Sequence, residues 1–156
     1  MAEQRDAGPC IFCDIVAGRA PASIVYRDEW VCAFMDIQPV NLGHLLVVPV
    51  THAPDLAVLE PDTGAQMFRV GQRLAAAIRR SGVRCDGINF FLADGEAAGQ
   101  EIFHVHLHVF PRCTGDAFGL RYGPEYDVLP DRSALEAMAS AVRAALGGID
   151  ARPQGL

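Results

Sequence analysis

The chain of 156 residues lacks an excess of positive charge, a long apolar run and an N-terminal export signal. Its formal net charge is −6, whereas general nucleic-acid and anionic-membrane binders gain affinity from clustered Lys and Arg, so we expect neither partner. No run approaches the roughly 20 apolar residues of a membrane-spanning helix, and residues 1–9 have no apolar core. We therefore expect a cytoplasmic location.

The cysteines do not suggest a disulfide framework. Their number is five, which is odd, and in a chain without a signal this indicates free thiols or metal ligands. Hydrophobic residues make up 51% and charged residues 21% of the chain, as in ordinary soluble globular proteins. The length fits one domain, which we expect at residues 10–148, with flexible tails at residues 1–9 and 149–156.

Residues 104–112 read His-Val-His-Leu-His-Val-Phe-Pro-Arg. This alternation predicts a β-strand with the apolar residues on one face and the three histidines on the other. His104 and His108 would lie about 13 Å apart at the backbone, which is too far for one metal ion to bind all three imidazoles. We therefore expect a metal site or a catalytic ridge in which the three histidines have different roles.

A Cys-x-x-Cys motif lies at residues 10–13. By itself it is compatible with a redox pair, half of a zinc site or two buried thiols. If the site holds zinc, the missing ligands must come from elsewhere, and His52 and His104 are the candidates because each lies at one end of an apolar strand. Cys2His2 is a common closed ligand set for structural zinc.

The remaining patterns predict an α+β fold with about five mostly antiparallel strands, one long internal helix and one C-terminal helix. Strands are expected at residues 23–27, 30–36, 44–49, 87–93 and 104–112. The internal helix begins at Pro61 and ends before Gly82. The C-terminal helix begins near Pro130 and carries an apolar face with Leu135 and Met138. We find no internal repeat and no second domain.

Three other sites have both an ordinary and a functional interpretation. Asp36 follows an apolar strand, where it can cap a turn before Pro39. His44 begins the next strand and can be a solvated end residue. Residues 94–100 read Asp-Gly-Glu-Ala-Ala-Gly-Gln, either a hairpin turn or a loop whose glycines let backbone N–H groups approach an anion.

These motifs together resemble the histidine triad (HIT) family of nucleotide hydrolases and transferases. Residues 104–110 match its His-φ-His-φ-His-φ-φ signature in full, where φ is apolar. The resemblance also includes the cysteine motif, Ala-Phe-Met-Asp at residues 33–36, Gly-His-Leu-Leu-Val-Val-Pro at 43–49, His52, and the loop at 95–100. It covers roughly residues 10 to 113.

The resemblance implies a role for each site residue. His106 would be the covalent nucleophile, with its tautomer fixed by the His104 carbonyl, and His108 would donate to the phosphoryl oxygens. Asp36 would bind the ribose hydroxyls, and His44 would hold other groups in position. Structural zinc would bind Cys10, Cys13, His52 and His104, and no catalytic cofactor is implied.

Further substrate contacts implied by the resemblance are Asn89, Asp94 and Gln100, with Gln100 at the phosphate or leaving atom. The family usually has Asn-Asn where this chain has Ala93 and Asp94. The first family asparagine is therefore absent. Its role transfers poorly to Asp94, because a carboxylate would repel phosphate.

The expected function is a nucleotidyl hydrolase or transferase that cleaves at the α-phosphate of nucleoside monophosphate derivatives, such as phosphoramidates or dinucleoside polyphosphates. The substrate would be a purine nucleotide, and the resemblance implies a homodimer. One alternative is a zinc-dependent hydrolase that uses His106 and His108 as ligands, for which no third ligand is evident. Another is a non-catalytic nucleotide-binding regulatory protein on the same fold.

Overall fold

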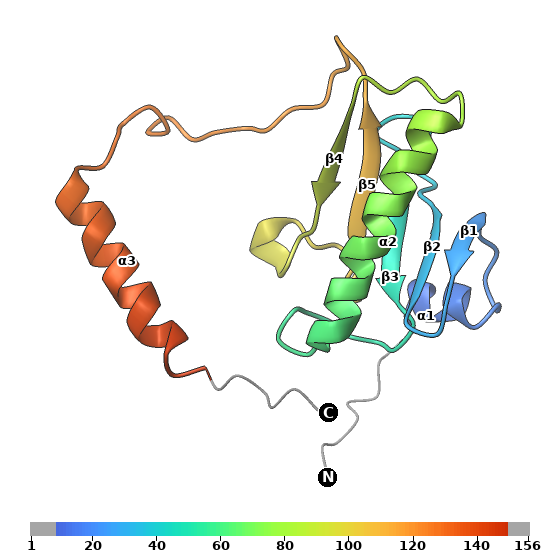
Figure 1. The fold of residues 1–156 in the computed structure, drawn as a ribbon, viewed down its shortest axis with the longest axis horizontal. Helices are drawn as coiled ribbons and strands as arrows, with labels where there is room; N and C mark the ends of the chain where they lie inside the picture. The colour runs from blue at the N-terminus through green and yellow to red at the C-terminus, as the bar shows by residue number, and fades with distance from the viewer. Residues whose placement is uncertain (1–8, 150–156) are drawn as a thin grey trace. The chain divides into compact units, whose positions relative to one another are not determined.

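The computed structural model describes residues 9–149 (Figure 1). Its elements in chain order are α1 (Ile11–Val16), β1 (Ile24–Arg27), β2 (Val31–Met35), β3 (Leu45–Pro49), α2 (Pro61–Arg80), β4 (Gly87–Phe91), the 3-10 turn η1 (Glu96–Ala98), β5 (Leu107–Arg112) and α3 (Arg132–Leu146). The chain divides after Phe118 into two compact units, the first with the sheet and the second with α3. The predicted tails lie almost wholly outside the described residues, and a single domain over residues 10–148 stays a prediction.

The five strands form one antiparallel sheet in the order β1-β2-β3-β5-β4. All five residues of β3 are buried, as its nearly continuous apolar sequence predicts for a central strand. The α+β prediction is confirmed. β5 lies between β3 and β4, so the histidines on and before it lie beside His44 at the start of β3 and beside the loop that follows β4.

Helix α2 covers one face of the sheet (Figure 1). Apolar residues at helical spacing, from Met67 to Ile78, are buried against β2, β3 and β5. Val105, Leu107 and Val109 belong to the same cluster, so the apolar side of the histidine segment faces α2 as predicted. The histidine side chains consequently point to the opposite face of the sheet.

Helix α1 covers part of that opposite face. Its residues Phe12, Ile15 and Val16 are buried against apolar side chains of β2 and β3. The sequence did not predict this helix, because six residues are too few to display a helical period. Its position brings the Cys-x-x-Cys motif, which begins one residue before α1, to the face that carries the histidines.

The structure corrects the predicted start of the histidine strand. β5 begins at Leu107 and not at His104. The N–H of His104 donates to the carbonyl of Ile102, and the N–H of Val105 donates to the carbonyl of Ala53, so neither group joins the sheet ladder. Only His108 of the three histidines therefore lies on a β-strand.

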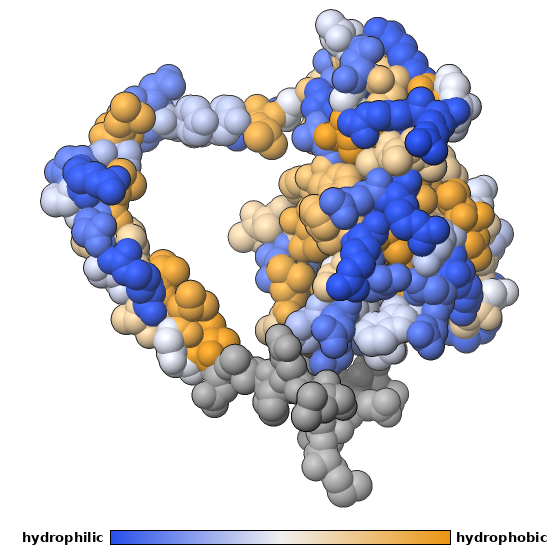
Figure 2. Space-filling view, in the orientation of Figure 1, coloured by the Kyte–Doolittle hydropathy of each residue, from blue (hydrophilic) through white to orange (hydrophobic). Residues whose placement is uncertain are grey.

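The second unit contains α3, which begins at the cap Asp131, whose carboxylate accepts from the N–H of Ala134. The predicted apolar face is present and exposed: Leu135 is 46% exposed and Met138 is 65% exposed. Figure 2 shows apolar side chains along this helix. No helix within residues 9–149 is long and apolar enough to cross a membrane.

Candidate functional site

The three histidines contact three different sets of groups, as their spacing predicts. His104 is fully buried and lies against Cys10, Cys13 and His52. His106 contacts a backbone carbonyl and an aromatic ring, and His108 contacts His44. One side of the sheet therefore carries a metal-type cluster, made of Cys10, Cys13, His52 and His104, and a pair formed by His44 and His108. His106 lies between the two.

His106 is buried, with 7% of its surface exposed, and its orientation is fixed. Its Nδ1 lies 2.7 Å from the backbone carbonyl oxygen of His104. Because a carbonyl only accepts, Nδ1 must carry the proton, and Nε2 then holds a free lone pair. The edge of the Phe12 ring packs at 5.3 Å between centroids and holds the imidazole in place. A neutral imidazole with a bare Nε2 is a nucleophile or a base.

His108 is oriented through His44. The N–H of Val40 donates to Nδ1 of His44 at 3.1 Å, so the proton of His44 must lie on Nε2. That Nε2 lies 2.9 Å from Nδ1 of His108, which therefore accepts. His108 is left with its proton on Nε2, so it presents a hydrogen-bond donor.

Burial favours the neutral form of both histidines of this pair. Burial lowers the pKa of His44, and the nearby Asp36 carboxylate opposes this. Burial, followed by the charges of His106 and His44, lowers the pKa of His108 to about 4. At neutral pH His108 can therefore act on a ligand as a hydrogen-bond donor and not as a cation.

Asp36 lies beside this pair, just after β2. Its Oδ1 accepts from the N–H of Gln38 at 2.8 Å, and its Oδ2 lies 3.5 Å from Nε2 of His44. A carboxylate has about four acceptor positions, so free lone pairs remain for a ligand hydroxyl. Ile37, the next residue in the chain, is 99% exposed.

Cys10, Cys13, His52 and His104 form a cluster whose ligand atoms all lie within 4.8 Å of one another. The two Nδ1 atoms are 3.3 Å apart, and Sγ of Cys13 lies 3.3 and 3.5 Å from those of His52 and His104. Tetrahedral zinc with ordinary bond lengths gives edges of about 3.3 Å between nitrogens and about 3.6 Å between nitrogen and sulfur. The residues present therefore fit a closed zinc site.

The tautomer of His104 also suits a metal ligand. Its Nε2 lies 2.9 Å from the carbonyl oxygen of Pro49, so this nitrogen donates and Nδ1 keeps its lone pair for the cluster. Burial and the neighbouring Cys10 raise the pKa of the Cys13 thiol to about 11. A metal that binds at neutral pH must therefore displace the thiol proton.

Two of the predicted substrate contacts in the loop after β4 bond to the backbone: Gln100 is buried, whereas Asp94 is exposed. Gln100 is 3% exposed, and its amide bonds to the N–H of Gly95 and to the carbonyls of Pro54 and Ile102. The carboxylate of Asp94 accepts from the N–H of Leu56 at 2.9 Å. Their contact with substrate stays a prediction, and the bonds that they make in the structure are to backbone groups.

Asn89, another predicted contact, lies on β4 on the same face as the histidines. Its Oδ1 accepts from Arg112 at 2.9 Å. Arg112 also binds Asp116 through Nε at 2.8 Å, and this pairing holds the pKa of the Asp116 carboxyl far below its usual range. The network fixes the chain beyond β5, and the substrate contact of Asn89 stays a prediction.

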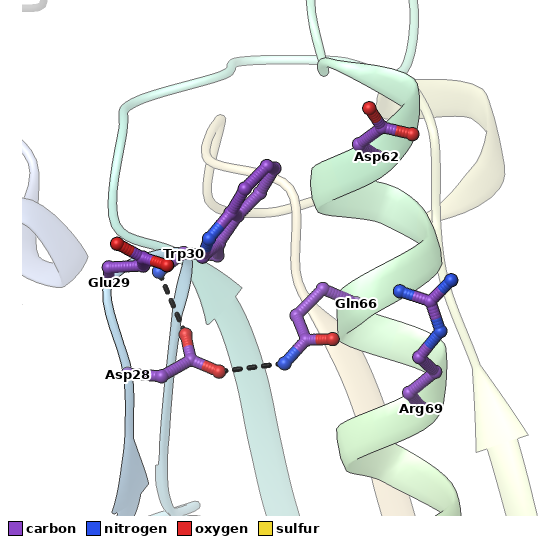
Figure 3. A pocket seen from close by; sticks show the side chains of 6 residues that line it. All are labelled: Asp28, Glu29, Trp30, Asp62, Gln66 and Arg69. Atoms are coloured by element: carbon purple, nitrogen blue, oxygen red, sulfur yellow. Dashed lines mark hydrogen bonds between the residues drawn. The ribbon is translucent and has the colours of Figure 1, made fainter. Parts of the chain in front are cut away.

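Figure 3 shows a polar pocket of about 360 Å³ between the β1–β2 turn and α2. Asp28 spans it by accepting from the N–H of Trp30 and from the side-chain amide of Gln66. The pocket is lined by residues of α2, which covers the face opposite the histidines. It therefore does not belong to the histidine site.

Three residues of the site were not predicted from the sequence. Phe12 packs on His106, Phe91 packs on His108 at 5.7 Å between centroids, and Ile37 is exposed beside Asp36. Phe12 lies inside the Cys-x-x-Cys motif, and Ile37 follows a candidate ligand-binding carboxylate. Their neighbours in the sequence could therefore have pointed to both residues. Phe91 had none, because its place opposite His108 depends on the strand register.

The HIT domain family matches residues 17–115 of this chain, a segment that includes β1 through β5 and all five histidines. The chain belongs to the HIT domain family. An uncharacterised HIT-like protein of Mycobacterium tuberculosis is 42% identical over 146 residues, which cover 94% of this chain and 99% of that protein. The resemblance predicted from the sequence is confirmed.

Two other HIT relatives bear on the site. A crystal structure of a Zn-bound histidine triad family protein from Mycobacterium smegmatis is 44% identical, with a TM-score of 0.68, and the match covers 90% of this chain and 97% of that one. An Arabidopsis thaliana protein named adenylylsulfatase HINT3 is 35% identical over 107 residues, covering 69% of this chain and 54% of that protein.

Proposed function

We propose that this protein is a nucleotidyl hydrolase or transferase that cleaves at the α-phosphate of a purine nucleoside monophosphate derivative. The observation that carries the proposal is the orientation of His106. Its Nδ1 is held by the His104 carbonyl at 2.7 Å, which leaves a buried Nε2 with a free lone pair. The His108 ring lies 4.9 Å away between centroids and presents an N–H donor. A nucleophile and a donor side by side suit attack on a phosphoryl group.

The reaction would proceed in two displacements. In the first, the Nε2 lone pair of His106 forms a bond to phosphorus while the bond from phosphorus to the leaving group breaks. The leaving group departs with the electron pair and takes a proton from solvent. His108 donates to the phosphoryl oxygens, where negative charge grows. In the second, water attacks phosphorus and gives up a proton to solvent, His106 leaves with its electron pair, and the nucleoside monophosphate is released.

Substrate orientation would come from residues next to the catalytic pair. Asp36 would accept hydrogen bonds from the ribose hydroxyls, and Ile37, at 99% exposure, would pack against the purine base. The backbone N–H groups of the loop around η1 would face the phosphate, where Gly95 and Gly99 have positive φ. A relative named adenylylsulfatase supports a substrate in which an adenylyl group is bonded to a leaving group.

Zinc would have a structural role at Cys10, Cys13, His52 and His104. The four ligand atoms match tetrahedral edges, and a Zn-bound relative supports the choice of metal. Four protein ligands leave no open position for a substrate. Among residues 9–149, His108 could share a metal with Asp36 and His44, but His106 belongs to no group of three candidate metal ligands. The geometry therefore does not favour a zinc-dependent hydrolase built on His106 and His108.

Turnover of adenosine 5′-phosphoramidate tests the proposal. Wild-type protein, His106→Ala and His108→Ala are mixed with substrate and quenched in alkali, which preserves the acid-labile N–P bond for mass spectrometry. We expect an AMP adduct on His106 of the wild type and none in His106→Ala. His108→Ala is the matched control: it should form the adduct about 10²- to 10³-fold more slowly, because it lacks only a donor.

The same experiment decides between the enzyme and its alternative. Equal activity in His106→Ala would remove His106 as the nucleophile. Tight AMP binding by the wild type with neither turnover nor adduct, on this and on dinucleoside polyphosphate substrates, would favour a regulatory nucleotide-binding protein on the HIT fold.

The proposal includes a cytoplasmic homodimer. The apolar face of α3 supports an oligomer, because the rest of the second unit leaves each of its residues at least 46% exposed: Leu135, Met138, Val142 and Leu146. All five cysteines are free, which suits a reducing compartment. Sedimentation equilibrium tests the assembly: the expected mass is twice 16.8 kDa, and a monomer at micromolar concentration would contradict it.

A further inference from the structure

The loop that follows β4 is tied to a distant segment by two side chains. Asp94 accepts from the N–H of Leu56 at 2.9 Å, and Gln100 donates to the carbonyl of Pro54 at 2.8 Å. Pro54 and Leu56 follow His52, a member of the metal-type cluster. One bond therefore lies at each end of the loop, and both reach the segment that begins at His52.

The loop needs such bonds to hold one conformation. Gly95 and Gly99 both have positive φ, and open space lies where a Cβ would stand on either residue. Backbone bonds of η1 hold the middle of the loop, with Gly95 accepting from Ala98 and Gln100, but no sheet ladder ties the loop to the rest of the protein, and glycine has the largest conformational entropy to lose. Donors that stabilise a phosphoryl group are effective only when they are oriented beforehand. The two side-chain bonds supply that orientation.

Gln100 has no donor left for a ligand in this arrangement. Its Nε2 carries two hydrogens, and these go to the carbonyls of Pro54 and Ile102 at 2.8 and 3.1 Å. Its Oε1 accepts from the N–H of Gly95 at 2.8 Å. The amide therefore closes the loop on itself and joins it to the neighbouring segment.

We propose that Asp94 is a positioning residue that, together with Gln100, holds the phosphate-facing loop against the segment after His52, and that it does not contact the substrate. The inference rests on the proposed function for the role of the loop. It gives the exposed carboxylate a role that needs no contact with the substrate, because one of its oxygens accepts the Leu56 N–H. Repulsion would disfavour Asp94 as a contact to the phosphate, but it does not disfavour this positioning role.

Three variants test the proposal by amide hydrogen exchange of the unliganded protein. Asp94→Ala removes the acceptor, and Asp94→Asn keeps an acceptor oxygen at the same place. Asp86→Ala is the matched control, because Asp86 accepts from the N–H of Thr114 at 2.7 Å and precedes β4, whereas Asp94 follows it. We expect the Leu56 amide to exchange about two- to tenfold faster in Asp94→Ala alone.

Kinetics on the phosphoramidate then separate positioning from contact. A positioning role predicts that kcat/KM falls about three- to tenfold in Asp94→Ala, and that Asp94→Asn restores it. A lower KM in both variants would show that the carboxylate repels the phosphate directly, and would overturn the proposal. So would unchanged Leu56 exchange, or unchanged kinetics, in Asp94→Ala. Absence of wild-type turnover is a separate result that refutes the proposed function, and the exchange measurement still decides whether Asp94 holds the loop.

Discussion

Replacing His44 tests the hydrogen-bond chain that orients His108. His44→Phe keeps a ring of similar shape but removes the acceptor for the Val40 N–H and the donor to Nδ1 of His108, two bonds of 3.1 and 2.9 Å. The second bond selects the tautomer and the ring orientation of His108. A neutral hydrogen bond contributes about 1 to 1.5 kcal/mol net, which corresponds to a five- to tenfold fall in kcat. Stability should fall by about 1 to 3 kcal/mol, because the Val40 N–H loses its partner.

The assay compares the kcat of His44→Phe with the kcat of His108→Ala and of His44→Gln. Removal of the His108 donor should lower kcat about 10²- to 10³-fold, far more than the loss of its orientation lowers it. The glutamine amide can accept from Val40 and donate to His108, so His44→Gln should recover part of the activity. Nitrogen NMR of the His108 ring reports the tautomer. The argument fails if His44→Phe leaves both kcat and the His108 tautomer unchanged, or if it costs as much as His108→Ala.

Three further predictions concern the metal, pH and the base. Cys13→Ala should lose one zinc per chain by elemental analysis and unfold at a lower temperature, since a structural zinc contributes on the order of 10 kcal/mol, whereas Cys113→Ala should keep the metal. The folded-state pKa of His108, about 4, lies below the unfolded value of 6.5, so the unfolded chain binds the proton first and stability falls as pH drops from 6.5 towards 4. Urea unfolding at pH 7 and 4.5 measures how far the free energy of unfolding falls between these two pH values. This fall should be about 2 kcal/mol smaller in His108→Gln than in wild type. Ile37→Ser should raise KM about tenfold with little change in kcat, and Leu42→Ser, another exposed apolar residue of the same loop at 82%, should change neither.

Local patterns in the sequence predicted most of the fold. The apolar stripe from Met67 to Ile78 predicted α2, and the alternation around Leu107 predicted which side of the chain faces that helix. These predictions succeed because periodicity reports burial directly. The start of β5 was wrong because alternation says nothing about where backbone N–H groups find partners, and the N–H of Val105 finds the carbonyl of Ala53.

The sequence predicted the members of the metal-type cluster, but not the aromatic neighbours of His106 and His108 or the contacts of the loop after β4. Residue type and spacing indicated the Cys2His2 set, and the structure brings its ligand atoms together. Sequence cannot tell whether a polar side chain faces a ligand or the protein, and Gln100 and Asp94 show the difference: both bond to backbone groups of other segments. Contacts of that kind depend on how the segment after His52 packs against the loop.

His104 belongs to the metal-type cluster and also bonds to His106, and this connects the geometry of the two parts of the site. Its Nδ1 faces Cys10 at 3.4 Å, its Nε2 donates to Pro49, and its carbonyl accepts from His106. A residue with 0% exposure and three partnered polar atoms has little freedom to move. Any shift that loosened the metal-type cluster would also move the acceptor that fixes the His106 tautomer. The first histidine of the triad therefore contributes to the nucleophile through its main chain while its side chain belongs to another site.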